Sequence, residues 1–160
     1  MKQIKLTQGQ YALVDDEDFD ELNQYKWHAY YDPNTKSYRA ITSISMHRKI
    51  MNTPRGMQTD HINHNTLDNR KQNLRICTHR QNQYNRVKHK NTTSKYKGVY
   101  LAKQKYKDKI YRYWMAYIFF NGKSINLGHF KTEIQAAHAY DKQAKELFGK
   151  FALLNFKVVE

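Results

Sequence analysis

The chain has 160 residues, of which 39% are hydrophobic and 26% charged, a composition typical of a folded globular protein rather than a disordered one. It contains no run of about 18 apolar residues, the length that a membrane helix needs. Its first residues, MKQIKLTQGQYALVDD, lack the apolar core of a signal peptide, so we expect a cytoplasmic protein without membrane contact. The single cysteine, Cys77, excludes an internal disulfide and a multi-cysteine zinc site, and we expect it to be buried.

The net charge of +14 is unevenly distributed along the chain. Six of the 14 acidic residues lie in the stretch DDEDFDE, residues 15–21. Between Arg86 and Arg112 the chain carries ten lysines and arginines and one acid, Asp108. A basic surface attracts a polyanion because each neutralised phosphate releases condensed counterions. We therefore favour a nucleic-acid partner over the alternative, a solvated face that only keeps the protein soluble.

Residues 1–50 are predicted to form short strands around one short helix. The segment KLTQGQYALVD places a turn at Gly9 before a strand. The acidic stretch that follows suits the positive end of a helix dipole, with Phe19, Leu22 and Tyr25 as its buried stripe. DPNTKS is predicted to be a turn, followed by a strand and a short helix in YRAITSISMHRKIM. The role of residues 1–45 stays open between a second recognition surface and packing for the next segment.

Residues 59–86, TDHINHNTLDNRKQNLRICTHRQNQYNR, are too polar to build a core. Thr78 and Gln81 have capping-box spacing, which predicts a helix with Asn82 in its first turns. A strand–loop–helix arrangement would then return Asn82 to Asp60, giving two oxygen ligands suited to Mg²⁺ or Mn²⁺. A neutral His61 could take a proton from water while the metal stabilises charge on a phosphate. These are the parts of a single-metal phosphodiester hydrolase.

Two other interpretations of this stretch are open. Histidine and asparagine in a loop can serve turn formation alone. A zinc site could instead use His61, His64 and His79, although their spacing fits no common arrangement and thiolates are missing.

Residues 91–160 follow the polar, basic linker KHKNTTSK and are predicted to form three strands and a helix. GVYLAK and YWMAYIFF are joined by the basic loop KQKYKDKIYR, and Asn121-Gly122 predicts a hairpin turn. Thr132 and Gln135 form a second capping box, and Gly149 suits the position after the helix. The predicted apolar stripe comprises Ile134, Ala137, Tyr140, Ala144 and Leu147, and the small residues Ala136, Ala137 and Ala144 would allow close packing.

The strand YWMAYIFF has two apolar faces. Trp114, Ala116 and Ile118 share one face, and Met115, Tyr117 and Phe119 share the other. One face must pack on the helix. The second is either an exposed aromatic surface flanked by lysines, which suits nucleic acid, or is buried against the N-terminal region.

The segments MHRKIM and TDHINHNTLDNRKQNLRICTHRQNQYNR are similar to the HNH family of endonucleases, above all to the homing enzymes of phages and introns. The resemblance implies a two-stranded hairpin and a helix around one divalent metal, at about residues 46–88. It implies metal ligands at Asp60 and Asn82, a general base at His61, and a catalytic Asn73 that pins the loop and orients the histidine. Many members have histidine at the last position, which leaves His79 as a rival ligand. We expect His64 in the loop, and His47 either packed or contacting phosphate.

The segments SKYKGVYLAK and YWMAYIFFNGKSINLGHFKTEIQAAHAYDKQAKELFGKFALLNF resemble the DNA-binding domain of plant ethylene-response and APETALA factors. The resemblance implies a three-stranded sheet in the DNA major groove. The implied groove-facing residues are Tyr100, Lys103, Tyr117, Phe119, Ser124 and Asn126. Because only Lys103 is basic, the plant target sequence does not transfer, and we expect phosphate contacts from Lys95, Lys97, Lys105, Lys107 and Lys109.

The sequence thus predicts an α+β protein, with an HNH nuclease module at 1–90 and a sheet-and-helix DNA-binding domain at 91–160. We expect a divalent-metal-dependent endonuclease, encoded by a phage or mobile element, that cuts double-stranded DNA without a small-molecule cofactor. A monomer would nick one strand, and a weak dimer could cut both. Two alternatives are a non-catalytic DNA-binding regulator and an RNA nuclease.

Overall fold

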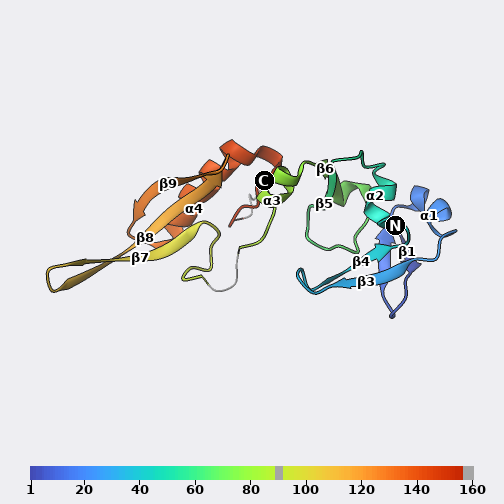
Figure 1. Cartoon of the computed structure of the whole chain (residues 1–160), viewed down its shortest axis with the longest axis horizontal. Coiled ribbons are helices and arrows are strands. Elements are labelled where there is room, and N and C mark those ends of the chain that lie inside the picture. The colour runs from blue at the N-terminus through green and yellow to red at the C-terminus, as the bar shows by residue number, and fades with distance from the viewer. Residues whose placement is uncertain (89–91, 157–160) are drawn as a thin grey trace. The chain divides into compact units, whose positions relative to one another are not determined.

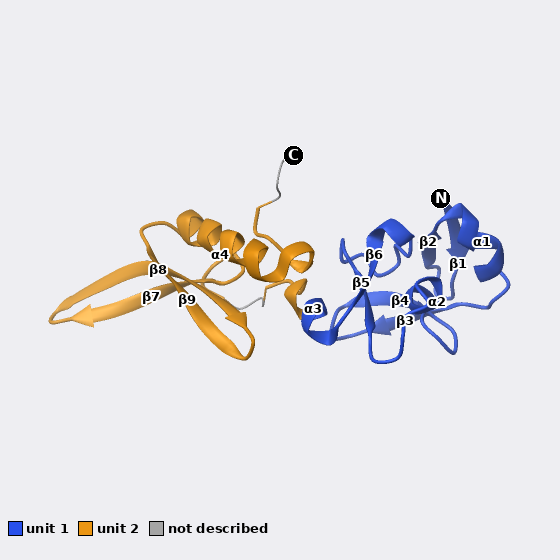
Figure 2. Cartoon of the chain, turned by 90° about the horizontal axis from the view of Figure 1, so that it is seen from above, with its two compact units in different colours: residues 1–82 blue, residues 83–160 orange. Residues whose placement is uncertain are grey.

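The computed structural model describes residues 1–88 and 92–156 (Figure 1). The chain divides into two compact units, Met1–Asn82 and Gln83–Glu160 (Figure 2). The boundary predicted at residues 90 and 91 lies outside the described residues. No helix in the described part of the chain is long and apolar enough to cross a membrane.

The first unit opens with two antiparallel strand pairs and two short helices. Strands β1 (Lys2–Lys5) and β2 (Tyr11–Val14) pair across a turn in which Gly9 has a φ of 67°. Helix α1 (Asp16–Leu22) follows, then the pair β3 (His28–Asp32) and β4 (Ser37–Ile41), and helix α2 (Met46–Ile50). Of these elements, β2, α1, β4 and α2 were predicted individually, but one side chain was assigned wrongly. Tyr25 lies beyond the end of α1 and is exposed, because the helix stops at Leu22.

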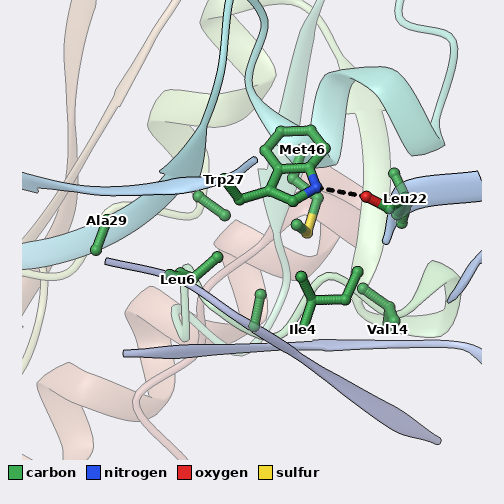
Figure 3. Packing of buried hydrophobic residues seen from close by; sticks show 9 residues of the cluster. Ile4, Leu6, Val14, Leu22, Trp27, Ala29 and Met46 are labelled. Carbon is green, nitrogen blue, oxygen red and sulfur yellow. Dashed lines mark hydrogen bonds between the residues drawn. The ribbon is translucent and has the colours of Figure 1, made fainter. Parts of the chain in front are cut away.

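Trp27 lies in the middle of the hydrophobic core of this unit (Figure 3). Its indole N–H donates a hydrogen bond of 2.8 Å to the carbonyl of Leu22, which satisfies the one polar atom of the side chain. Leu6, which follows β1, and apolar side chains from β1, β2, α1, β3, β4 and α2 make up the rest of the cluster. Leu67 packs against it. This residue belongs to the polar stretch 59–86, which we call the histidine- and asparagine-rich segment. Residues 1–50 therefore form the base on which that segment rests.

The histidine- and asparagine-rich segment folds as a hairpin followed by a helix. Strand β5 (Gln58–His61) pairs antiparallel with β6 (Leu74–Cys77), which follows the short 3-10 helix η1 (Lys71–Asn73), and helix α3 (His79–Tyr84) comes next. The predicted capping box is confirmed, since the Gln81 N–H donates to Thr78 Oγ1 and the Thr78 N–H donates to Gln81 Oε1. Cys77 is buried, as expected.

The second unit is a three-stranded antiparallel sheet packed on a helix. Its strands are β7 (Val99–Tyr106), β8 (Lys109–Phe120) and β9 (Lys123–Phe130), in the order β7-β8-β9. Helix α4 (Glu133–Phe148) lies along one face and ends in the 3-10 turn η2 (Gly149–Phe151). The capping box at Thr132 and Gln135 is complete, and Asn121 and Gly122 both have positive φ in the β8–β9 turn.

The buried face of α4 is narrower than predicted. Ala136, Ala137 and Ala144 have no exposed surface, which confirms that small residues bring the helix close to the sheet. Ile134, in contrast, is 53% exposed, so its assignment to the stripe was wrong. At about 100° per residue it lies roughly a quarter-turn from the centre of the buried side chains.

The two faces of β8 differ in exposure. Ala116 and Ile118 are buried in the clusters that pack on α4, whereas Tyr117 is 41% and Phe119 61% exposed. Within the described part of the second unit, no element covers this second face of the sheet. Figure 1 shows β7 and β8 running on together beyond the end of β9.

Candidate active site

Asp60 and His61 are neighbours on β5, and both side chains are buried although both are polar. Successive side chains of a strand point to opposite sides, so the two face different surroundings. Asp60 lies directly across from Arg75 of β6. The Arg75 Nε and Nη2 atoms both donate to Asp60 Oδ2, at 2.9 and 2.7 Å. An arginine on the partner strand thus holds the carboxylate in place.

His61 faces a different partner, the side chain of Asn69. The imidazole Nε2 lies 3.2 Å from Asn69 Oδ1. Asn69 Nδ2 donates to the Leu67 carbonyl at 3.3 Å, which turns the carboxamide oxygen toward the histidine. A carboxamide oxygen only accepts hydrogen bonds, so His61 Nε2 must carry the proton here. In the neutral ring the lone pair then resides on Nδ1, the nitrogen that can accept a proton.

A second histidine contributes to the same pocket. The rings of His47, from α2, and His61 meet edge to face, with centroids 5.0 Å apart. Burial lowers the pKa of His47 to about 3, helped by the His61 ring when it is protonated and by the charges of Arg39 and Arg48. Burial also lowers the pKa of His61, while the contact with Asn69 and the charges of Asp60 and Asp68 act in the opposite direction. Both rings are therefore neutral at pH 7, the state in which a histidine can act as a base.

The side chain of Asn73 spans the loop between β5 and β6. Its Oδ1 accepts the Asn63 N–H at 3.0 Å, and its Nδ2 donates to the Asp68 carbonyl at 2.8 Å. The Asn73 carbonyl accepts the Ile62 N–H at 2.9 Å. The two ends of the loop are thereby tied to one buried residue.

Asp68 and Arg70 fix the far end of this loop. Arg70 Nε and Nη2 donate to the two carboxylate oxygens of Asp68, each at 2.7 Å, and Asn63 Nδ2 adds a bond of 3.0 Å. The bond from Arg70 is the main reason that the pKa of Asp68 is lowered. Asn69, next in sequence, is 1% exposed and cannot turn away from His61 without disrupting this network.

The N-terminal region also holds the loop in place. Leu13 of β2 donates its N–H to the Leu67 carbonyl and accepts the Asn69 N–H, both at 2.8 Å. The Lys71 N–H donates to Asp15 Oδ2 at 2.7 Å. Residues 1–45, whose role was left open, therefore include a strand that fixes the backbone of the residue contacting His61.

Asn82 lies on α3, against β5. Its Nδ2 donates to Gln58 Oε1 at 2.8 Å, and Gln58 shares its face of β5 with Asp60, two residues on. With Nδ2 engaged, Oδ1 is the atom that Asn82 can offer to a cation. The carboxylate of Asp60 and this carboxamide oxygen are a donor set that fits a hard divalent ion.

His79 and His64 have other contacts and surroundings. His79 Nδ1 is 3.2 Å from Gln58 Nε2, and His64 is exposed in the loop with a φ of 64°. Among residues 1–88 and 92–156, no group of three histidine, cysteine or acidic side chains is placed to hold a metal. The zinc site of His61, His64 and His79 is therefore not assembled.

A second candidate surface lies on the open face of the sheet in the other unit. An open depression of about 390 Å³ is lined by Thr92, Val99, Tyr100, Met115, Tyr117, Ser124 and Asn126. Four of the six residues predicted to face a DNA groove thus lie together, and Phe119 pairs with Ser124 beside them. Lys103 does not join them: three residues from Tyr100 on an uninterrupted strand, it lies on the opposite face.

The predicted phosphate-contacting lysines differ in their surroundings. Lys105, Lys107 and Lys109 are exposed, and the Lys95 ammonium lies 5.1 Å from the ring centroid of Tyr96. Lys97 instead donates from Nζ to the Tyr84 carbonyl at 2.7 Å, and burial lowers its pKa to about 8. Its ammonium is therefore engaged within its own unit.

Asn69, Arg75 and Leu13 were not singled out from the sequence. Arg75 could be found only from the β5–β6 register, which the loop length does not fix. No spacing rule points to Asn69 or to Leu13, because their contacts depend on how the loop folds back.

Residues 52–84 match a family model described as HNH endonuclease. A protein of Acanthamoeba polyphaga mimivirus, described as an uncharacterized HNH endonuclease, is 32% identical over 154 residues. The match covers 92% of this chain and 75% of the relative. No solved structure matches the chain. The chain belongs to the HNH endonuclease family, and its enzymatic class is that of a nuclease.

Proposed function

We propose that the chain is a metal-dependent DNA endonuclease with His61 as its general base. The observation that carries this proposal is the pairing of a buried, neutral His61 with Asn69 beside the carboxylate of Asp60. His61 Nδ1 would take a proton from a water molecule as its oxygen bonds to phosphorus. The bond from phosphorus to the 3′ oxygen would break, leaving a 5′-phosphate and a 3′-hydroxyl.

Asp60 and Asn82 would hold a divalent cation, Mg²⁺ or Mn²⁺. The ion would supply positive charge to the scissile phosphate and the leaving oxygen. Asp60 must then share its carboxylate with, or release it from, Arg75. Asn73 would act by keeping the loop, and with it Asn69, against His61.

The open face of the sheet would bind the major groove of double-stranded DNA. Its resemblance to the plant DNA-binding domain supports this, as do the exposed Tyr117 and Phe119 and the depression beside them. Tyr100, Tyr117, Phe119, Ser124 and Asn126 would face the bases, with Lys95, Lys105, Lys107 and Lys109 on phosphates. Such a module raises the local concentration of DNA at the nuclease site. One site per chain would nick one strand.

The test uses a supercoiled plasmid library with random inserts, incubated with Mg²⁺ or Mn²⁺. We expect wild type to convert it to open circles only with metal, and His61→Ala to leave it supercoiled. His64→Ala, which changes the exposed histidine three residues away, is the matched control and should cut like wild type. If neither wild type nor His61→Ala cuts the plasmids, although both bind DNA in a gel shift, the result would favour a non-catalytic DNA-binding regulator.

A competition experiment distinguishes the proposed DNA endonuclease from the alternative, an RNA nuclease. Duplex DNA and RNA of equal length and sequence are mixed at moderate salt, and binding and cleavage of each are measured. Tighter binding and faster cleavage of RNA would contradict the proposal, because an open sheet with aromatic side chains also suits RNA.

A further inference from the structure

The sheet of the second unit carries an extension that has no third strand. Strand β9 pairs with β8 only from Trp114 to Phe120, whereas the β7–β8 pairing continues to Tyr106 and Lys109. Residues 103–112 therefore form a two-stranded ribbon, which we call the arm. Figures 1 and 2 both show it projecting past β9. Every residue of the arm is exposed, so neither of its faces packs on α4.

The cations of the arm are sorted between its faces by the register. Lys103 lies directly opposite Arg112, and Lys105 follows two residues later on the same face. The fourth member of that face is Ile110, which is 58% exposed. Three positive charges thus gather on one face of a narrow ribbon.

This arrangement costs stability in the free protein. Like charges directly opposite each other on paired strands repel. No ion pair found in the described part of the chain involves Lys103, Lys105 or Arg112. A solvated surface normally interleaves both signs, but Asp108, in the turn, is the only acid among residues 103–112. A polyanion relieves the repulsion, which favours a binding role over a solvated one.

The spacing favours a sugar–phosphate backbone as the polyanion. Lys103 and Lys105 are two residues apart on a strand, about 7 Å at a rise of about 3.4 Å per residue. Each strand of duplex DNA carries phosphates at a regular rise of about 3.4 Å along its axis, so a regularly spaced row of cations can follow one strand.

We infer that the face formed by Lys103, Lys105 and Arg112 binds the backbone of double-stranded DNA outside the stretch held by the sheet. The inference rests on the proposed binding of DNA by the sheet, and it adds a second contact. Lys103 lies on the opposite face from Tyr100, so these cations cannot share the phosphates beneath the recognition surface. Four residue pairs carry the arm roughly 14 Å beyond the three-stranded part, about four base-pair steps of DNA.

The test compares the double variant K103Q/K105Q with K142Q/K145Q, which removes the same charge from exposed lysines of α4. Binding to a long duplex is measured by fluorescence anisotropy in chelator, so that no strand is cut. Between 50 and 200 mM salt, wild type should lose about tenfold more affinity than the arm variant, because two phosphate contacts are missing. The α4 variant should follow wild type. On a short duplex that spans only the three-stranded part of the sheet, wild type and both variants should show the same salt dependence of binding. Thermal unfolding confirms that each variant is folded.

Other outcomes overturn the inference. Equal salt dependence of wild type and the arm variant would do so. So would a salt dependence of the α4 variant that is reduced as much as that of the arm variant. Tyr117→Ala separates this failure from that of the proposed function. If Tyr117→Ala weakens binding but the arm variant does not, the sheet binds DNA and the arm does not. If wild type fails to bind duplex DNA at all, both fail.

Discussion

The imidazole of His61 and the carboxamide of Asn69 lie 3.2 Å apart, from Nε2 to Oδ1, with both side chains buried. This single contact sets which nitrogen of the histidine carries a proton. It also ties the candidate base to the loop, whose position depends on Asn73 and on β2. Asn69 is thus a positioning residue for His61.

Asn69→Ala should therefore lower the cleavage rate by about 10- to 100-fold, the usual loss when an orienting partner is removed. The affinity for DNA should be unchanged, because Asn69 is buried away from the surface. Single-turnover cleavage and gel shifts measure the two separately. Asn69→Asp keeps an acceptor oxygen at the same place and should restore part of the rate. Equal losses in both variants would indicate a structural role only.

Arg75→Gln should make the stability of the protein depend on metal. The substitution removes the arginine from a buried ion pair and leaves the Asp60 carboxylate without that cation, which should lower the free energy of unfolding by about 3 kcal/mol. If Asp60 is a metal ligand, Mn²⁺ should restore part of this loss and raise the melting temperature more than in wild type. The control D60N/R75Q has no charge to neutralise, so Mn²⁺ should have no effect on it. A metal effect of equal size in both variants would exclude Asp60 as a ligand.

Leu13→Pro should reduce cleavage while leaving DNA binding intact. Proline has no N–H, so the bond from Leu13 to the Leu67 carbonyl is lost and the loop carrying Asn69 is released. That N–H points away from β1, so the β1–β2 pairing can persist. Leu13→Ala removes the side chain but keeps the N–H, and should cut nearly as fast as wild type. A reversed order of the two variants would show that the side chain, rather than the backbone, holds the loop.

Gly98→Ala should destabilise the second unit by more than about 3 kcal/mol. Gly98 has a φ of 74°, and a Cβ there would lie 2.0 Å from Tyr140 Cδ2 and 2.7 Å from the Tyr117 carbonyl oxygen. Gly122 has a similar φ of 78° but open space around it, so Gly122→Ala should cost only about 1 kcal/mol. Amide exchange of β8 peptides under increasing urea measures both. Similar losses would mean that backbone strain, not the clash, decides.

The predictions that rested on capping boxes and on a turn dipeptide were confirmed. The capping boxes at Thr78 and Thr132 need only residues within one helical turn, so their sequence spacing was enough. The turn at Asn121-Gly122 was equally local. Alternation placed Tyr117 on the face of β8 that is turned away from the helix, but it left open whether that face is exposed.

What the sequence could not supply were contacts fixed by register and by the path of a loop. The pairing of Asp60 with Arg75 depends on how β5 and β6 are aligned, and the intervening loop does not dictate that. The face on which Lys103 lies likewise depends on the register with β8, which the resemblance to the plant domain does not give. Trp27, at the centre of the first core, belongs to no motif and was not singled out.

The bond between Leu13 and Leu67 has a consequence for how such a nuclease is divided. The family match begins at residue 52, yet the backbone that seats Asn69 is anchored by a strand near the start of the chain. The segment that the family model matches is thus smaller than the unit that folds. An exchange of nuclease modules between proteins of this kind has to transfer residues 1–82 together. A graft of the matched residues alone would lack the strand β2 that holds the backbone of Leu67 and Asn69.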